Sequence, residues 1–467
     1  MNQNSQTQQS EKMQSPSIQQ ADIVVALDIG TTKVSAVVGR KNILGNIEVI
    51  GYGKVISDGV IRGVVSNIDK TAKAVADAID QAEKTSRQEI QTVYVGIAGQ
   101  HIRSIMHQGV LYRSEPRKEI TREDVDKLIQ DMYKIALPPG DQILHVIPQE
   151  FMVDEEEGVT DPIGMTGSRL QSNFHIITGN ISAASNITKC LEKAGVTVSG
   201  MMLEPLASAQ SVLSSDEKEA GVVLVDIGGG TTDVTIYHEG IIRYTSVIPL
   251  GGNIITKDIK SGCSVTLEQA EKLKVRFGSA LSEEIIDNRI ITIPGLMGRE
   301  PKEISEKNLA RIIQARVQEI FDYVMWDIHR SGFENKLVGG IVLTGGGSLL
   351  KNIDLLAEYQ TGLAARIGNP AEYLSSYYSD ELSSPIYATS LGLLMEGMKS
   401  VELPAPDKRN VANKVFDLED QDIPVMEEVR ELVYADEKNE EGWFNRMVNN
   451  GYKSVRKFFE ANPDSEF

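Results

Sequence analysis

Cysteine and histidine are scarce in this chain, which has 2 cysteines and 6 histidines among 467 residues. Cys190 and Cys263 stand far apart without CxxC spacing, so we expect two reduced thiols rather than a disulfide framework. The histidines form no HExxH or comparable pattern. The sequence therefore predicts no metal centre built from cysteine and histidine ligands.

Basic residues and long apolar runs are lacking as well. Lys and Arg total 47 against 66 Asp and Glu, and this net charge of -19 argues against nucleic acid as a partner. No apolar run approaches the roughly 20 residues needed to cross a bilayer. The length and the 41% hydrophobic content predict a soluble globular protein of two to four domains. Residues 1–21, rich in Gln and Ser, are predicted to form a disordered extension.

One phrase occurs twice in the chain. "ALDIGTTKVSAVVGR" at 26–40 and "VDIGGGTTDVTIYHEG" at 225–240 both read as strand, tight turn and strand, with Asp closing the first strand. This internal repeat predicts a duplicated α/β fold. We expect one half at 22–103 and 180–219, and the other at 220–261 and 331–400. Residues 104–179 read as an inserted α/β subdomain, with a helix at about 122–136 capped by Thr121 and Asp124, and 262–330 as a largely helical insertion.

The doubled turn has the chemistry of a phosphate site. Backbone N–H groups in a Gly-rich turn can point at one anion, and Thr hydroxyls add short donors. The carboxylates of Asp28 and Asp226 would face the same space and hold Mg²⁺, mostly through water. One copy alone is equally compatible with an ordinary hairpin, but two matching copies favour two jaws around a polyphosphate. The candidate ligands in the turns are Gly30, Thr31, Thr32, Lys33, Gly228, Gly229, Gly230, Thr231, Thr232 and Asp233.

Two further segments fit the same site. "GGIVLTGGGSLLKNIDLL" predicts a strand, a turn of Gly345, Gly346 and Gly347, and a helix capped by Ser348, although plain packing would explain this pattern alone. "TLEQAEKLKVRFG" predicts a helix with a Thr266–Gln269 capping box and a stop at Gly278. Glu271 and Lys274 share a face of that helix, where they would grip ribose and base or form a solvated ion pair.

Glu204 and Pro205 mark the point where a strand enters a helix, since proline suits the first helical turn. Glu204 is a catalytic candidate that would orient a water toward a γ-phosphate. The alternative is an ordinary polar residue at a helix start.

Together these motifs, over residues 22–398, resemble the actin, sugar-kinase and chaperone superfamily of ATP-binding proteins. "AGQHIRS" and "HVIPQEFMVDEEEGVTDPIGMTGSRL" are similar to the FtsA family of bacterial cell-division proteins. The resemblance implies duplicated actin-like (ribonuclease-H-like) domains with subdomains 1A (22–103 and 180–219), 1C (104–179), 2A (220–261 and 331–400) and 2B (262–330). It also implies binding of ATP and Mg, with weak or slow hydrolysis.

The same resemblance implies a peripheral membrane protein at the cytoplasmic face of the cell membrane, at the division site. Such a protein polymerises, anchors FtsZ filaments and contacts other division proteins. Subdomain 1C would contribute to self-association, and subdomain 2B would dock the C-terminal peptide of FtsZ. Arg311 and Arg316, on a predicted helix of 2B, are candidates for contacting that peptide. The alternative is that they belong to a solvated charged face of the helix.

The C-terminal region supports a membrane tether on its own composition. Residues 401–442 hold 13 acidic and 5 basic residues and three prolines, which is typical of a linker. Residues 443–460 predict an amphipathic helix in the membrane interface, weakened by Gly451 at a cost of roughly 1 kcal/mol. A terminal helix packed on the protein's own core is the alternative. The apolar stripe is Trp443, Phe444, Met447, Val448, Tyr452, Val455, Phe458 and Phe459, and the basic residues beside it are Arg446, Lys453, Arg456 and Lys457.

Two rival functions share the predicted fold. A small-molecule kinase would need a catalytic carboxylate beside an acceptor pocket, for which Glu204 is the one candidate. A pilus-assembly or cell-shape relative is the other rival, and the segments that are similar to FtsA argue against it.

Overall fold

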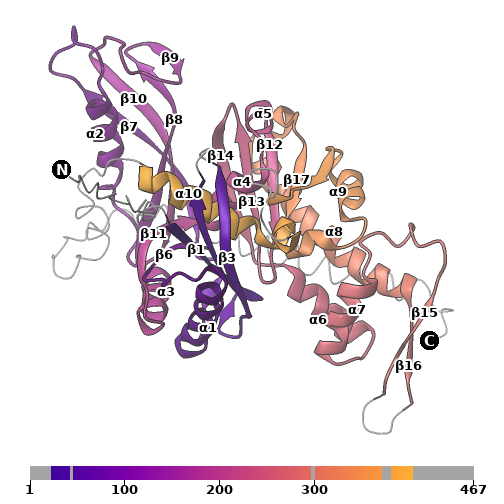
Figure 1. Cartoon of the computed structure of the whole chain (residues 1–467). Coiled ribbons are helices and arrows are strands. Elements are labelled where there is room, and N and C mark those ends of the chain that lie inside the picture. Colours follow the sequence, from indigo (N-terminus) through magenta and orange to yellow (C-terminus); the bar gives the residue numbers. More distant parts are fainter. Residues whose placement is uncertain (1–22, 43–45, 296–299, 371–379, 403–467) are drawn as a thin grey trace, which may run out of the picture. The chain divides into compact units, whose positions relative to one another are not determined.

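The computed structural model describes residues 23–42, 46–295, 300–370 and 380–402 (Figure 1). The predicted N-terminal extension, the linker from residue 403 onward and the amphipathic helix 443–460 with its whole apolar and basic stripe lie outside the described residues. Helix α10 (Ala388–Glu402) runs two residues into the predicted linker. Within the described ranges, no helix combines the length and the apolar character that a membrane span requires.

Two five-stranded sheets have the same topology. In the first, the strand order is β11-β6-β1-β2-β3, and in the second it is β18-β17-β12-β13-β14. In each sheet the first three strands in sequence pair antiparallel, and the next two pair parallel on the other side of the first strand. The internal repeat predicted from the sequence is therefore confirmed in the strand order. The strands are β1 (Ile23–Ile29), β2 (Lys33–Lys41), β3 (Ile47–Ile56), β6 (Thr92–Ile97), β11 (Thr197–Leu203), β12 (Val222–Ile227), β13 (Thr232–His238), β14 (Ile241–Ile248), β17 (Ile341–Thr344) and β18 (Ala365–Ile367).

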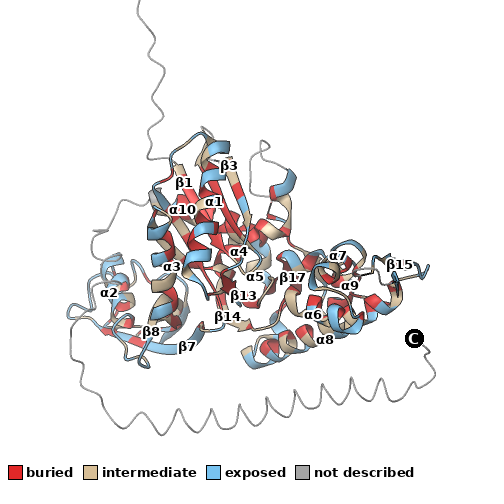
Figure 2. Ribbon diagram, turned by 90° about the horizontal axis from the view of Figure 1, so that it is seen from below, coloured by how far each residue is buried: buried red, intermediate tan, exposed pale blue. Residues whose placement is uncertain are grey.

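Helices cover both faces of each sheet. The core on one face of the first sheet includes α1 (Ile68–Ser86) and α3 (Ile181–Lys193). A second core joins both sheets through α4 (Glu204–Val212) and α10, which lie between them (Figure 1). A third core covers the far face of the second sheet with α8 (Glu306–Ser331) and α9 (Ile353–Thr361). Figure 2 shows the buried residues gathered along the strands and on the inward faces of these helices.

Strand alternation decides where the two repeated aspartates point. Val25 and Leu27 of β1 belong to the outer core, whereas Val24 and Ala26 belong to the core between the sheets. Because successive side chains alternate, Asp28 faces the layer of α4 and α10. The same period in β12 turns Asp226 toward that layer from the other sheet. The duplicated sequence thus aims two carboxylates at one place.

The first insertion forms its own small α/β unit. Its sheet has the order β7-β10-β8-β9, and its core is separate from the other three. The predicted capping box of Thr121 and Asp124 is confirmed, but the helix ends at Met132 rather than near 136, since Tyr133 begins a turn. The elements are β7 (Arg103–Tyr112), α2 (Arg122–Met132), β8 (Asp141–Val153), β9 (Glu156–Val159) and β10 (Arg169–Asn180).

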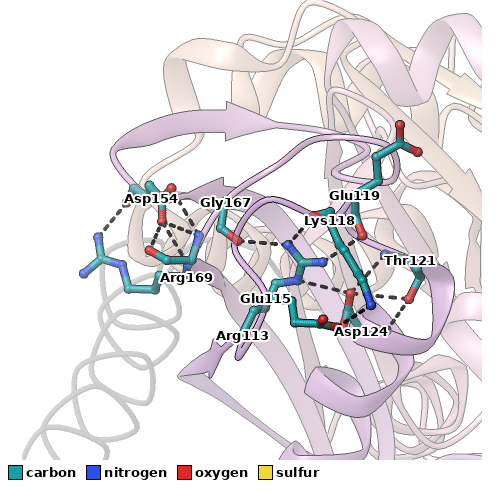
Figure 3. A network of polar contacts seen from close by, with 10 residues as sticks. Arg113, Glu115, Lys118, Glu119, Thr121, Asp124, Asp154, Gly167 and Arg169 are labelled. Atoms are coloured by element: carbon teal, nitrogen blue, oxygen red, sulfur yellow. Dashed lines mark hydrogen bonds and ion pairs between the residues drawn. The ribbon is translucent and has the colours of Figure 1, made fainter.

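An arginine fastens the loop before α2 (Figure 3). The Arg113 guanidinium donates to the carbonyls of Lys118 and Gly167 at 2.9 Å and of Glu119 at 2.7 Å, and to Asp124 at 3.2 Å. Its side chain is only 7% exposed. The Arg113 guanidinium therefore supplies the hydrogen bonds that hold this loop, which has no regular secondary structure of its own.

The second insertion, residues 262–330, is largely helical but contains a strand pair that the sequence does not predict. Besides α7 (Leu267–Phe277) and α8, it has two short antiparallel strands, β15 (Ile290–Ile293) and β16 (Lys302–Ser305). Helix α6 (Gly252–Gly262) directly precedes it. The alternation in "IITI" and "KEIS" buries Ile291 and Ile304 against the core of the second half. Apart from short 3₁₀ turns, the remaining elements of the described residues are β4 (Val60–Ile61), β5 (Val64–Val65) and α5 (Ser215–Ala220).

Candidate functional site

The two repeated turns have the same hydrogen bond and lie against each other. Gly30 N–H donates to the Lys33 carbonyl, and Gly228 N–H donates to the Thr231 carbonyl, each at 2.9 Å. A methyl group placed on Gly229 would lie 2.0 Å from Thr32 Oγ1, and one on Gly230 would lie 2.7 Å from Thr31 Oγ1. The glycines therefore permit a close approach of the two halves.

A cavity of about 560 Å³ opens where the turns meet, within the size range of sites for small molecules and cofactors. Of the residues that the sequence predicts for the nucleotide site, all but Thr232 and Gly345 line this cavity. Thr232 donates its hydroxyl to the Leu250 carbonyl at 2.9 Å, and Gly345 lies directly behind Asp226. The predicted residues in the lining are Asp28, Gly30, Thr31, Thr32, Lys33, Glu204, Asp226, Gly228, Gly229, Gly230, Thr231, Asp233, Glu271, Lys274, Gly346 and Gly347.

Besides Glu271, four carboxyl groups line this cavity, those of Asp28, Glu204, Asp226 and Asp233. Burial raises the pKa of Asp226, against a hydrogen bond from Ser208 that lowers it. Burial and the charge of Asp226 raise the pKa of Asp233 well above its usual range. Burial, followed by the charges of Asp28, Asp233 and Asp226, likewise raises the pKa of Glu204, with Lys33 opposing. The site thus concentrates negative charge that a cation would relieve.

No three His, Cys, Asp or Glu side chains of the described residues come close enough together to ligate a metal ion directly. Asp233 Oδ1 is buried and has no hydrogen-bond partner within the described residues. The arrangement provides acceptors around an open space rather than a finished ligand shell, which suits a cation that keeps its water.

Hydroxyl groups hold the two aspartates crosswise. Ser208 on α4 donates to Asp226 of the second half at 2.7 Å, and Ser390 on α10 donates to Asp28 of the first half at 3.3 Å. Ser390 is also 2.8 Å from Ser35, and Thr389 donates to Asp226 at 3.5 Å. None of these four residues is predicted from the sequence. A lone Ser or Thr inside a helix or strand carries no pattern that separates a contact with a carboxylate from an ordinary hydrogen bond to backbone.

Lys33 is the cation at the first turn. It forms an ion pair with Asp28 and donates to Ser35 at 3.1 Å. Its ammonium group lies 5.6 Å from the centre of the Tyr387 ring. Lys54, which also lines the cavity, lies at 5.5 Å from the same ring and pairs with Glu381 at 3.0 Å. Positive charge therefore reaches the cavity from β2 and from β3.

Helix α7 supplies an ion pair to the wall. The predicted capping box of Thr266 and Gln269 and the stop at Gly278 are confirmed. Lys274 pairs with Glu271 at 2.8 Å and donates to the Gly252 carbonyl at 3.0 Å. The Lys274 side chain is only 12% exposed and that of Glu271 is 45% exposed, so the pair is partly buried on the lysine side and open to solvent on the glutamate side.

The third glycine turn differs from its prediction. Gly346–Leu349 form a 3₁₀ turn, in which Ser348 donates its hydroxyl to the Gly345 carbonyl at 2.7 Å. Ser348 therefore does not cap a helix. The following α-helix starts only at Ile353, because Leu350 is extended and Asn352 adopts a left-handed conformation. Gly346 and Gly347 still line the cavity.

Glu204 stands at the junction of β11 and α4, with Pro205 in the first turn as predicted. A methyl group on Gly96 of β6 would lie 2.8 Å from Glu204 Cγ, so the glycine leaves the space that the glutamate fills.

In the second insertion, Arg316 pairs with Asp258 at 2.6 Å and with Glu319, and Arg311 donates to Asn308 at 3.3 Å. Arg316 is thus paired both with its own helix α8 and with α6 of the neighbouring subdomain 2A.

Comparisons with known proteins bear on the whole chain. The family model "Cell division protein FtsA" matches residues 223–392, and the model "SHS2 domain inserted in FTSA" matches residues 99–178. "Cell division protein FtsA" of Neisseria meningitidis is 41% identical and covers 85% of this chain and 95% of its own length. The proteins of the same name from Pseudomonas aeruginosa and Escherichia coli are 38% and 36% identical, over 89% and 81% of this chain.

A solved structure supports the fold alone. A chain of the "PilM-PilN type IV pilus biogenesis complex" is 15% identical, with a TM-score of 0.60, and the match covers 80% of this chain and 98% of that one. The duplicated actin-like fold predicted from the sequence is confirmed by this similarity and by the paired sheet topologies. The full-length matches identify the chain further, and it belongs to the FtsA family of cell division proteins.

Proposed function

We propose that this protein binds Mg-ATP in the cleft, polymerises at the cytoplasmic face of the cell membrane and anchors FtsZ filaments at the division septum. The observation that carries the nucleotide part is the meeting of two matching glycine turns at one cavity lined by Asp28 and Asp226. The cell-division part rests on the family.

The residues in the cleft fit a nucleotide with its metal. The two turns would hold phosphate oxygens with backbone N–H groups and with the hydroxyls of Thr31, Thr32 and Thr231. Asp28 and Asp226 would hold Mg²⁺ through its water ligands, and the ion would neutralise phosphate charge. Glu271 and Lys274 would contact the ribose and base.

Glu204 would accept a hydrogen bond from a water molecule and orient it toward the terminal phosphate. Its place at the start of α4, beside the phosphate turns, supports this role. A residue that only positions a water, without a strong base beside it, is consistent with slow hydrolysis.

The membrane and partner assignments rest on sequence and family. The basic amphipathic segment 443–460 would lie in the membrane interface, joined to the cleft domains by the acidic linker. Subdomain 2B would dock the C-terminal peptide of FtsZ, and subdomain 1C would take part in self-association and contacts with other division proteins. Polymerisation would strengthen a weak single anchor by avidity.

Co-sedimentation with lipid vesicles tests the proposal as a whole. The full chain and a chain ending at Glu441 are each mixed with vesicles and purified FtsZ, with and without Mg-ATP. We expect the full chain to sediment and to bring FtsZ with it, and the shortened chain to leave both in solution. If neither chain binds vesicles or FtsZ, the anchor function is wrong. Phosphoryl transfer to a sugar above the rate of hydrolysis would instead support the kinase alternative.

A second variant tests the anchor without shortening the chain. Replacing Trp443 and Phe444 with Glu removes apolar area from the stripe and adds charge opposed to an anionic surface. The variant should stay in solution with FtsZ still bound to it. Unchanged sedimentation of the variant would contradict the anchor.

A further inference from the structure

The strand that leads to Glu204 lies at the edge of its sheet. Among the strands that the structure describes, β11 pairs only with β6, and the register sets Leu203 opposite Ile97. The N–H of Leu203 points instead to the inserted subdomain, where it donates to His145 Nε2 at 3.0 Å. A backbone donor at a strand-to-helix junction, which would otherwise lack a partner, is thus satisfied by an imidazole from β8.

The imidazole is held in the form that accepts this hydrogen bond. Burial lowers the pKa of His145 to about 4, so the ring is neutral at neutral pH. Because Nε2 accepts, the single ring proton belongs on Nδ1. Leu144 and Ile147, on either side of His145 in sequence, pack against the core that includes Leu203. The position of β8 against the first half therefore fixes the position of the ring.

The junction that His145 holds also directs the Glu204 side chain. Leu203 is the N-cap residue of α4, and no side chain among the described residues caps this helix. Glu204 follows directly and lies in the narrow space above Gly96. A rotation of the Leu203 backbone would therefore reorient the Glu204 carboxyl group, because the narrow space above Gly96 does not let the side chain compensate. Four residues further along α4, Ser208 holds Asp226.

We propose that His145 is a positioning residue, which fixes the Leu203–Glu204 junction and so ties the orientation of the Glu204 carboxylate to the seating of the inserted subdomain. The inference rests on the proposed role of Glu204 in ATP hydrolysis. It adds a residue outside the cleft, in a different subdomain, on which that hydrolysis depends.

Variants of the full-length protein separate positioning from folding. His145→Leu keeps an apolar side chain of similar size without the acceptor, and His145→Gln offers an amide oxygen in its place. His175→Leu is the matched control, since His175 is buried, has its pKa lowered to about 4 as His145 does, and lies on β10 of the same sheet, where its side chain contacts Ser104 rather than Leu203. Glu204→Gln sets the background rate.

Three measurements are made on each variant. These are the affinity for a fluorescent ATP analogue, the single-turnover rate of ATP hydrolysis, and hydrogen exchange of the Leu203 amide. We expect His145→Leu to lower the rate on the order of 10-fold with affinity nearly unchanged, because misplacing a catalytic group costs rate more than binding. The Leu203 amide should exchange faster. His145→Gln should recover most of the rate, and His175→Leu should keep it.

The proposal is overturned if His145→Leu hydrolyses ATP at the wild-type rate, if His145→Gln is as slow as His145→Leu, or if His175→Leu is equally slow. A loss of affinity that matches the loss of rate would also overturn it, since the effect would then be a general loss of structure. If the wild-type chain binds no ATP, the proposed function itself fails. If it binds ATP but hydrolyses no faster than Glu204→Gln, nucleotide binding stands and the positioning role of His145 is wrong.

Discussion

Gly230 shows how a single missing side chain sets the contact between the two turns. A methyl group there would lie 2.7 Å from Thr31 Oγ1 and 2.9 Å from the Arg62 Cα atom. Backbone cannot rotate away as a side chain can, and Thr31 Oγ1 itself accepts from the Gly63 N–H at 3.1 Å. The two halves must therefore separate slightly to accept an alanine.

We expect Gly230→Ala to lower the free energy of unfolding by about 1 to 3 kcal/mol and to weaken ATP binding. Urea unfolding and titration with a fluorescent ATP analogue measure the two effects. Gly346→Ala is the control for stability, because a methyl group at that position would meet only Ile386, at 3.8 Å. Equal unfolding free energies for the two variants would refute the close contact.

Asp233 gives a prediction for pH. Burial first, and then the charge of Asp226, raise the pKa of Asp233 in the folded protein above its value in the unfolded chain. The folded state therefore binds the proton more tightly. Ionisation of Asp233 costs stability at neutral pH, and this cost disappears as the pH falls to the unfolded value of about 4.

Asp233→Asn should consequently be more stable than the wild type at pH 7 without nucleotide, by on the order of 1 kcal/mol. The advantage should shrink steadily between pH 7 and pH 4.5. Thermal unfolding at several pH values measures the difference, with the exposed Asp216→Asn as the control. An advantage independent of pH would count against ionisation as its cause.

At the scale of elements, the Arg113 fork carries the loop before α2. Its guanidinium reaches three carbonyls and Asp124, whereas a lysine has one ammonium group and reaches fewer of them. We expect Arg113→Lys to lower the free energy of unfolding by about 1 kcal/mol, because a lysine cannot donate to all three carbonyls and Asp124 at once. Hydrogen exchange should rise in residues 113–121 before it rises elsewhere in the subdomain.

Arg122→Lys is the matched control for that substitution. Arg122 lies at the start of the same helix, its side chain is 77% exposed, and its pairing with Asp126 spans 3.5 Å. Exposed pairs of this kind contribute little to stability. If both substitutions leave exchange in the loop unchanged, Arg113 does not hold it.

The elements that could be predicted from the sequence are those whose patterns are local. The alternation in β1 and β12, the caps of α2 and α7 and the glycine turns are each contained in a few consecutive residues, so their structures could be predicted. Ser348 was misassigned, because its local pattern fits a helix cap and a 3₁₀ turn equally well. The β15–β16 pair was missed since four-residue strands carry too little pattern to be separated from a loop.

The parts that the sequence could not predict are those made by contacts between distant segments. Ser208 and Ser390 are recognisable as site residues only once α4 and α10 lie between the sheets. These helices cross closely, because a methyl group on Gly392 would lie 1.7 Å from the Ala207 carbonyl oxygen. Likewise, His145 and Leu203 are far apart in the sequence, and no spacing rule connects them.

At the scale of the whole molecule, the duplication makes each half depend on the other for its aspartate. Helix α4 of the first half holds Asp226 through Ser208, and helix α10 of the second half holds Asp28 through Ser390. Each carboxylate also has a partner in its own half, Thr389 for Asp226 and Lys33 for Asp28, so the full set of contacts forms only when both halves are in place. The affinity for a metal ion that binds between the two aspartates would therefore depend on how the two halves are placed relative to each other.

Ser208→Ala and Ser390→Ala test this dependence. We expect each to weaken Mg-ATP binding roughly 3- to 10-fold, since a hydrogen bond to a charged group contributes about 1 kcal/mol or more. Ser211→Ala is the control, because Ser211 is buried on the same helix as Ser208 but donates to backbone carbonyls, those of Ala388 at 2.7 Å and Ser208 at 3.0 Å, rather than to a carboxylate. Its loss should reduce stability and leave the affinity for Mg-ATP unchanged.

The double variant distinguishes a shared metal from two separate contacts. If one ion is held between Asp28 and Asp226, the second substitution acts on a site already loosened by the first, and the two effects on binding will not add. If the aspartates act independently, the double variant will lose the product of the two single factors. Titration with Mg²⁺ at fixed ATP measures this directly. Independent effects would mean that the Ser208 and Ser390 hydroxyls each stabilise one aspartate separately. The affinity for nucleotide would then not depend on how the two halves are placed relative to each other.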